Sequence, residues 1–163
     1  MQVQEKPPLD KPPLERPSLE RPSLYDRLGG VYNIATVVDD LIDRLMSDPR
    51  LNANPRVEEA HHRVSPAGFK YLATELVCSA AGGPQTYTGR SMGDAHRHLM
   101  ITDQEWQAFM GDLQQTFDKF DVPQPEREEL VAIVESTKEA IVVAPLEEGS
   151  AAAAGADDRS RTA

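Results

Sequence analysis

The stretch Tyr87–His96 most constrains how this chain folds, because it must pass from a loop into a short helix within a few residues. Ser91 is placed to cap that helix, with Asp94 three residues on as a capping-box partner. Met92 and His96 are four residues apart and therefore share one helical face. An imidazole at the end of an apolar face suits a metal bound in an apolar pocket.

Spacing alone does not assign a metal to His96, since a lone histidine on a short helix is more often a surface or core residue. The stretch resembles the group I truncated haemoglobins, together with Ile101-Thr102 and a helix that carries Trp106. The similarity extends upstream to the Ser-Leu-Tyr-Asp-Arg-Leu-Gly-Gly run at 23–30 and downstream to about Val143. In that family the histidine at the position of His96 is the proximal ligand of haem iron, so the resemblance implies a haem b cofactor (iron protoporphyrin IX).

Apolar residues recur at three- and four-residue spacing in four longer stretches, which predicts four helices. A short helix precedes them and is separated from the first by Gly29-Gly30. Residues 51–64 have no clear period and are predicted to be mostly loop. No stretch favours a strand, so the predicted fold class is all-α, and the resemblance implies a 2-on-2 sandwich of two antiparallel helix pairs around haem. The longer predicted helices cover 31–47, 66–78, 102–120 and 125–141.

Residues 6–25 repeat a five-residue pattern that combines a cation, proline and leucine. Regular proline forbids a helix and removes donors that a sheet needs, so we expect an extended, polyproline-like arm. The arm is interpreted as a disordered tail or, alternatively, as a docking arm for a partner, since proline-rich segments fill aromatic grooves. The expected organisation is an arm over 1–22, a globin domain over 23–143 and a disordered Ala-rich, acidic tail over 144–163.

Composition narrows the class of protein. With 163 residues, 39% of them hydrophobic and 27% charged, the chain suits one soluble globular domain. The net charge of −10 argues against nucleic acid and offers no basic patch for a membrane. The chain shows no signal core and only Cys78, predicted to be a buried thiol, so we expect a cytoplasmic protein without an internal disulfide.

The resemblance also implies which side chains contact the haem, although each wall residue would serve equally well as ordinary core packing. Arginine forks suit the propionate carboxylates. The expected contacts are Met92, Leu99, Ile101, Trp106 and Phe109 on the side of His96, Phe69, Leu72, Ala73 and Leu76 opposite, and Tyr87 and Arg90 at the propionates.

The side opposite His96 departs from the family. Many relatives have Phe-Tyr where this chain has Leu41-Ile42, and an aromatic pair where it has Asn54-Pro55. Relatives often have glutamine at the positions of Phe69 and Ala73. Loss of a charge-assisted hydrogen bond to bound oxygen, worth about 1.5–3 kcal/mol, predicts faster oxygen release.

His62 or His61 is the candidate replacement donor, or a sixth iron ligand; the alternative is a solvated histidine pair. Tyr71 is a weaker option because it lies off the main apolar stripe. His96 and His98 diverge on a helix, which disfavours a shared zinc ion.

The predicted function is a haem-binding globin that reversibly binds oxygen, nitric oxide or carbon monoxide. Nitric oxide dioxygenation with an external reductase would be a secondary activity, and no catalytic side chain is assigned. The alternatives are a six-coordinate haem sensor or electron-transfer protein, and a haem-free helical interaction module that uses the arm.

Overall fold

The computed structural model describes residues 21–143, so most of the predicted arm and the whole predicted tail lie outside the described residues. Those residues are helical throughout, apart from loops and one bridge between Ile101 and Val142. None of the described helices is long and apolar enough to cross a membrane. The elements are α1 (Leu24–Arg27), α2 (Gly30–Ser47), α3 (Pro49–Asn52), α4 (Pro55–Arg63), α5 (Pro66–Ala80), α6 (Met92–His96), the 3-10 turn η1 (Arg97–Leu99), α7 (Asp103–Lys119), α8 (Gln124–Glu135) and α9 (Lys138–Ile141).

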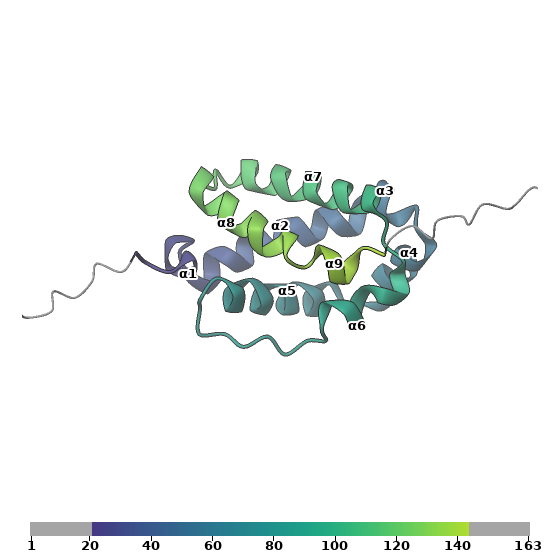
Figure 1. The fold of residues 1–163 in the computed structure, drawn as a ribbon, viewed down its shortest axis with the longest axis horizontal. Coiled ribbons are helices and arrows are strands. Elements are labelled where there is room, and N and C mark those ends of the chain that lie inside the picture. Colours follow the sequence, from purple (N-terminus) through teal and green to yellow (C-terminus); the bar gives the residue numbers. More distant parts are fainter. Residues whose placement is uncertain (1–20, 144–163) are drawn as a thin grey trace, which may run out of the picture.

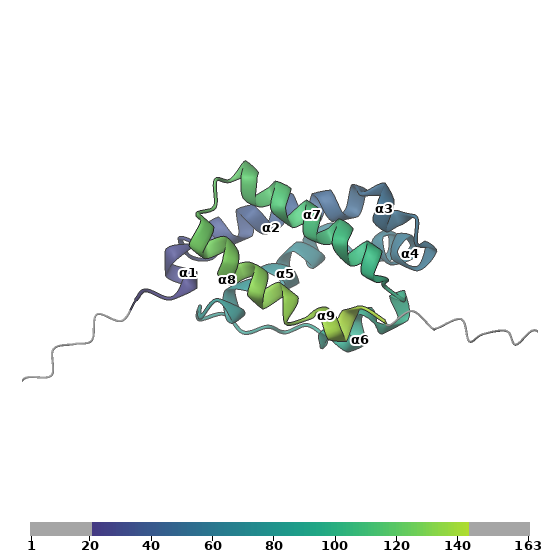
Figure 2. The same ribbon diagram turned by 45° about the horizontal axis from the view of Figure 1, so that its top comes forward.

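Two antiparallel helix pairs make up the fold, which confirms the predicted all-α, 2-on-2 architecture. The helices α2 and α5 pack together as one pair, and α7 and α8, which run in opposite directions and share an apolar cluster, form the other (Figure 1). The loop after α5 returns along that helix to α6, which lies beside α9 in both views (Figure 2). The helix α5 packs mainly on α2, whereas α6 packs on α9 and η1.

Side-chain caps explain where the helices begin. The side chains of Ser91 and Thr102 accept hydrogen bonds from backbone N–H groups of α6 and α7. Thr102 and Glu105 form the predicted capping box. Gly29 and Gly30 have φ values of 90° and 79°, a conformation that glycine adopts readily, and they turn the chain from α1 into α2.

The prediction that residues 51–64 are mostly loop is wrong, because the segment holds the end of α3 and all of α4. Asp48 and Asn54 cap these helices, and Pro49 and Pro55 occupy their first turns. Leu51 is the buried residue of α3 and Val57 that of α4, so neither helix carries an apolar stripe. The predicted last helix is also interrupted, since α8 ends at Glu135 and α9 begins at Lys138.

Two apolar clusters form the core. One joins α2 to α5 and α7, and the other joins α1 to α7 and α8. Cys78 is fully buried, as predicted, and burial raises the pKa of its thiol. The buried members are Ile34, Val38, Ile42, Leu45, Leu51, Val57, Cys78 and Ala108 in the first cluster, and Leu24, Ala81, Leu113, Phe117, Val122 and Leu130 in the second.

The carboxylate of Asp40 connects α2 to α7. It accepts hydrogen bonds from Thr116 Oγ1 at 2.9 Å and Arg44 Nε at 2.7 Å, and it pairs with Lys119. Burial alone would raise the pKa of Asp40, but these donors outweigh it and lower the pKa to about 2. This ion-paired carboxylate is therefore charged across the neutral range.

A buried pair of carboxyl groups also joins the end of α2 to α7. Asp48 and Asp112 are 6% and 5% exposed, and Arg50 bonds Asp48 at 2.7 Å but reaches Asp112 only at 3.4 Å. The hydrogen bonds from Arg50 lower the pKa of Asp48, whereas burial and the neighbouring Asp48 raise the pKa of Asp112 to about 6. Asp112 Oδ2 is buried without a partner among the described residues.

We predict that Asp112→Asn stabilises the fold at higher pH. Since folding raises the pKa of Asp112 from 3.8 to about 6, the folded chain keeps a proton that the unfolded chain releases, and stability falls as pH rises through that window. Asparagine removes this penalty and keeps a donor for Asp48. At about pH 8 we expect a gain of about 1–2 kcal/mol that shrinks towards about pH 5, measured by chemical denaturation.

Asp121→Asn is the matched control, because Asp121 is exposed and lies outside the pair. A stability difference for Asp112→Asn that does not change with pH would show that folding does not raise the pKa of Asp112.

Candidate functional site

His96 ends α6 with its ring held in a defined orientation. Its Nδ1 lies 2.9 Å from the carbonyl oxygen of Met92. A carbonyl only accepts hydrogen bonds, so Nδ1 carries the proton and Nε2 keeps its lone pair. Burial lowers the pKa of His96, which favours this neutral form. Within residues 21–143 nothing hydrogen-bonds Nε2, so the ring presents a free, unprotonated nitrogen of the kind that binds metals.

Apolar side chains on several elements remain only half-buried. The helix α5 buries Glu75 and Cys78, yet its larger apolar residues stay partly exposed. A helix normally buries such a face against a neighbour, and α5 packs mainly on α2. The half-buried set includes Phe69, Leu72, Ala73 and Leu76 on α5, Met92 on α6, Leu99 on η1, Ile101 in the link before α7, and Phe109 on α7. These residues come from several elements and are of the apolar type that lines cofactor sites.

Trp106 differs from the other predicted wall residues. It is 2% exposed and packs edge-on against Phe109 with ring centroids 5.3 Å apart. Its Nε1–H is buried and has no partner among the described residues, which costs about 1–3 kcal/mol. Trp106 therefore supports the wall from the core, while Phe109 reaches the half-exposed surface.

The loop before α6 is tied to α5 by Glu75. One oxygen of this buried carboxylate accepts from Thr88 N at 3.1 Å and from Thr88 Oγ1 at 2.7 Å. The hydrogen bonds from Thr88 outweigh burial and lower the pKa of Glu75, with a further contribution from Tyr71. Sequence reasoning missed this contact, although a lone carboxylate in the middle of the apolar stretch of α5 was a signal for it.

The two predicted propionate partners have different surroundings. Tyr87 Oη donates to the carbonyl oxygen of Arg90 at 2.7 Å, which uses its proton. A Cβ at Gly89 would lie 2.3 Å from that hydroxyl oxygen, so a larger residue there would displace the Tyr87 ring. Arg90 is exposed, and one guanidinium nitrogen lies 3.5 Å from the Asp94 carbonyl oxygen. Of the two, Arg90 is the better placed to bind a carboxylate.

The position expected to face a gas ligand is apolar. Ile42 is 2% exposed, and Phe69 and Ala73 pack against its cluster. None of the three carries a hydrogen-bond donor. Tyr71, the weaker distal option, is 62% exposed and lines a surface hollow between α2 and α5, so that suggestion is wrong.

The histidines of α4 make no contact that identifies them as distal residues. His61 Nδ1 is hydrogen-bonded to Asn52 Oδ1 at 2.8 Å, and burial followed by the charge of His62 lowers the pKa of His61. His62 is exposed. His61 would have to leave Asn52 to approach a ligand beside Ile42, so a distal role for either histidine stays a prediction.

The backbone after His96 is fastened by α4, which sequence reasoning did not find. Asn54 Nδ2 donates to the Leu99 carbonyl at 2.9 Å, and Arg56 Nη1 donates to the His98 carbonyl at 3.1 Å. Met100 follows with a left-handed φ of 54°, a conformation that costs a residue other than glycine about 1 kcal/mol. The bonds from α4 hold this strained corner in place.

Comparison with known proteins agrees with this geometry. Residues 23–143 match the family described as bacterial-like globin. The chain belongs to this family. Among curated relatives of this globin, a group 1 truncated haemoglobin of Chlamydomonas moewusii is 27% identical over 134 residues, covering 78% of this chain and 72% of the relative. One from Synechocystis is 28% identical over 115 residues, covering 68% and 87%.

Solved structures have the same fold as this globin. The 2/2 haemoglobin of Synechococcus sp. PCC 7002, in the cyanomet state with covalently attached haem, superimposes with a TM-score of 0.60 at 28% identity, covering 73% of this chain and 95% of that one. The truncated haemoglobin of Tetrahymena pyriformis in its Fe(III) form has a TM-score of 0.63 at 20% identity, covering 76% and 100%. Membership of this family implies a haem cofactor.

We predict that Asn54→Ala destabilises the globin. The change removes the cap of α4 and the hydrogen bond to the Leu99 carbonyl, so we expect a loss of about 1–3 kcal/mol. Denaturant unfolding followed by circular dichroism measures it. Asn33→Ala, at an exposed position on α2, is the matched control and should change stability by much less. Equal effects of the two substitutions would show that Asn54 of α4 does not stabilise the backbone after His96.

Proposed function

We propose that this globin binds haem b through His96 and reversibly binds diatomic gases, namely oxygen, nitric oxide and carbon monoxide. The observation that carries the proposal is the His96 ring, with Nδ1 donating to Met92 and Nε2 free, beside apolar side chains left half-buried. Bound haem would supply an iron centre that gases can reach. The relatives named above as haemoglobins support the same cofactor.

In this proposal each residue has a defined task. His96 Nε2 holds the iron, the Met92 carbonyl keeps that nitrogen unprotonated, and Arg90 binds a propionate. Tyr87 supports Arg90 by bonding its carbonyl. The apolar walls are formed by Met92, Leu99, Ile101 and Phe109 beside His96, with Trp106 behind them, and by Phe69, Leu72, Ala73 and Leu76 opposite.

The apolar surroundings of Ile42 determine how tightly each gas is held. A ligand that gains negative charge on binding is stabilised by a nearby donor, and Ile42, Phe69 and Ala73 supply none. Oxygen is therefore released quickly, whereas carbon monoxide depends less on a donor. Any nitric oxide dioxygenation would draw electrons from a separate reductase, and we place this activity in the cytoplasm, where the free thiol of Cys78 stays reduced.

The first test is His96→Ala. We expect loss of stable haem binding, because the substitution removes the nitrogen that holds the iron. Titration with haem, followed by the Soret absorbance of the ferrous and carbon monoxide forms, measures it. His98→Ala is the control, since His98 is exposed two residues further on and should leave the spectra unchanged. Full haem retention by His96→Ala with an unaltered ferrous spectrum would refute the assignment.

The second test restores a donor with Ile42→Tyr. We expect oxygen dissociation to slow by roughly ten- to a hundredfold, the effect of about 1.5–3 kcal/mol of added hydrogen bonding. Ile42→Phe is the control, since it adds a similar ring without the hydroxyl. Stopped-flow measurement of oxygen dissociation compares the two. A wild-type rate that is already slow and becomes fast in His62→Ala would instead place the donor on α4.

A further inference from the structure

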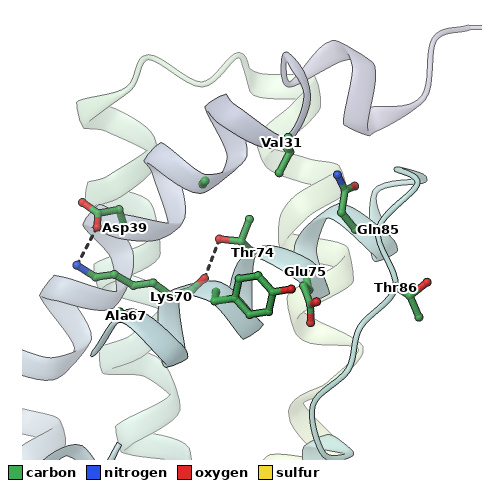
Figure 3. A pocket seen from close by; sticks show the side chains of 10 residues that line it. Val31, Asp39, Ala67, Lys70, Thr74, Glu75, Gln85 and Thr86 are labelled. Atoms are coloured by element: carbon green, nitrogen blue, oxygen red, sulfur yellow. Dashed lines mark hydrogen bonds and ion pairs between the residues drawn. The ribbon is translucent and has the colours of Figure 1, made fainter. Parts of the chain in front are cut away.

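A surface hollow of about 550 Å³ lies between α2 and α5, and we call it the α2–α5 groove. Val31, Ala35 and Asp39 line it from α2, and Lys70, Tyr71 and Glu75 line it from α5 (Figure 3). Tyr71 is two residues from both Phe69 and Ala73, so on a helix it faces the opposite way. The groove is therefore separate from the proposed haem site.

The groove presents apolar surface that the described part of the chain leaves uncovered. Tyr71 is 62% exposed and Val31 is 42% exposed, and both line it. Lys70 Nζ lies 2.8 Å from Asp39 and 2.7 Å from Asp43. Two carboxylates share one ammonium group, so this end of the groove keeps a negative charge. An exposed aromatic ring beside unneutralised acid suits a basic, proline-rich peptide.

The structure shows how one unit of the pentapeptide repeat binds to the domain. The fourth copy, Arg21–Tyr25, lies within the described residues. Its leucine, Leu24, is 8% exposed and belongs to the core, and its cation, Arg21, lies 3.9 Å from Glu129. The carbonyl of Pro22 accepts a hydrogen bond from Arg27 Nε at 3.1 Å. This copy thus buries a leucine, pairs a cation with an acid and engages its backbone.

The position and length of the arm allow the preceding copies to reach the groove. Gln85 lines the groove, and its Nε2 donates to Tyr25 Oη at 3.3 Å, so one end of the groove begins beside the fourth copy. From Val31 to Asp39 the helix rises about 12 Å, and five residues of polyproline helix span about 15 Å. One repeat therefore matches the groove in length.

We propose that one five-residue repeat from residues 6–20 of the same chain docks in the α2–α5 groove. The repeat prolines lie against the ring of Tyr71, a leucine lies over Ala35, and a repeat cation pairs with Asp39 and Asp43. This contact is independent of haem and covers the exposed rings and acids that the domain otherwise leaves to solvent.

The test uses the full-length protein with a nitroxide spin label on Ser18→Cys, in the arm. Cys78 is fully buried, so wild-type protein treated with the same reagent should take up no label. The protein is reduced and saturated with carbon monoxide, the reductant is removed, and only then is the label attached; amide spectra are compared before and after the nitroxide is chemically reduced. We expect a larger loss of peak intensity at Ala35 and Tyr71 than at Val131 and Ala132, which line a smaller hollow between α7 and α8 and follow Glu129, the partner of Arg21.

Tyr71→Ser in the labelled protein should restore the peak of Ala35, whereas Tyr32→Ser, at a tyrosine 82% exposed outside the groove lining, should not. Broadening at Val131 instead of Ala35, or no broadening at all, would overturn the proposal. A mixture of isotope-labelled protein without a spin label and spin-labelled protein without isotope distinguishes docking within one molecule from docking between two molecules. Broadening of the groove peaks in that mixture would assign the docked arm to a second molecule and overturn docking within one chain.

Discussion

The hydrogen bond from His96 Nδ1 to the Met92 carbonyl is the contact on which the candidate site depends. It decides which ring nitrogen is protonated, and hence whether Nε2 is able to bind iron. The helix that holds both residues spans only Met92–His96, which is too short to be stable alone. Contacts with residues outside α6 stabilise this short helix. They are the Ser91 cap, the packing of α6 on α9, and the Glu75–Thr88 bonds that fix the preceding loop.

The helix α5 keeps apolar surface that the described part of the chain does not bury. In α5 a carboxylate and a thiol are buried, whereas Phe69, Leu72 and Leu76 stay half-exposed. Such a helix is poorly suited to a protein that only has to fold, because its apolar surface faces water. It suits a protein whose cofactor completes the core, since a ligand that binds only the folded chain adds to its stability. The folded globin and its affinity for haem are in this sense parts of one equilibrium.

The sequence predicted those features that depend on local signals. The capping box at Thr102, the glycine turn at 29–30 and the apolar stripes of α2, α5 and α7 were sufficient to identify these helices, whereas the 2-on-2 arrangement was predicted from the family resemblance. The helix α4 was missed because Val57 is its buried residue, so the apolar period was absent even though Asn54-Pro55 is a good helix start. The bond from Asn54 to Leu99 joins residues 45 positions apart, and no local pattern encodes such a contact.

The departure from the family at Asn54-Pro55 has a structural explanation. Many relatives carry an aromatic pair at the matching positions. This chain instead starts a helix, and the Asn54 side chain bonds the backbone just after His96. Arg56 adds a second bond at the His98 carbonyl, next to the strained Met100. This chain therefore has polar bonds from α4 to the backbone after His96 where relatives have an aromatic pair. Because these bonds act on the histidine segment itself, the position of that segment does not depend on donors near Ile42.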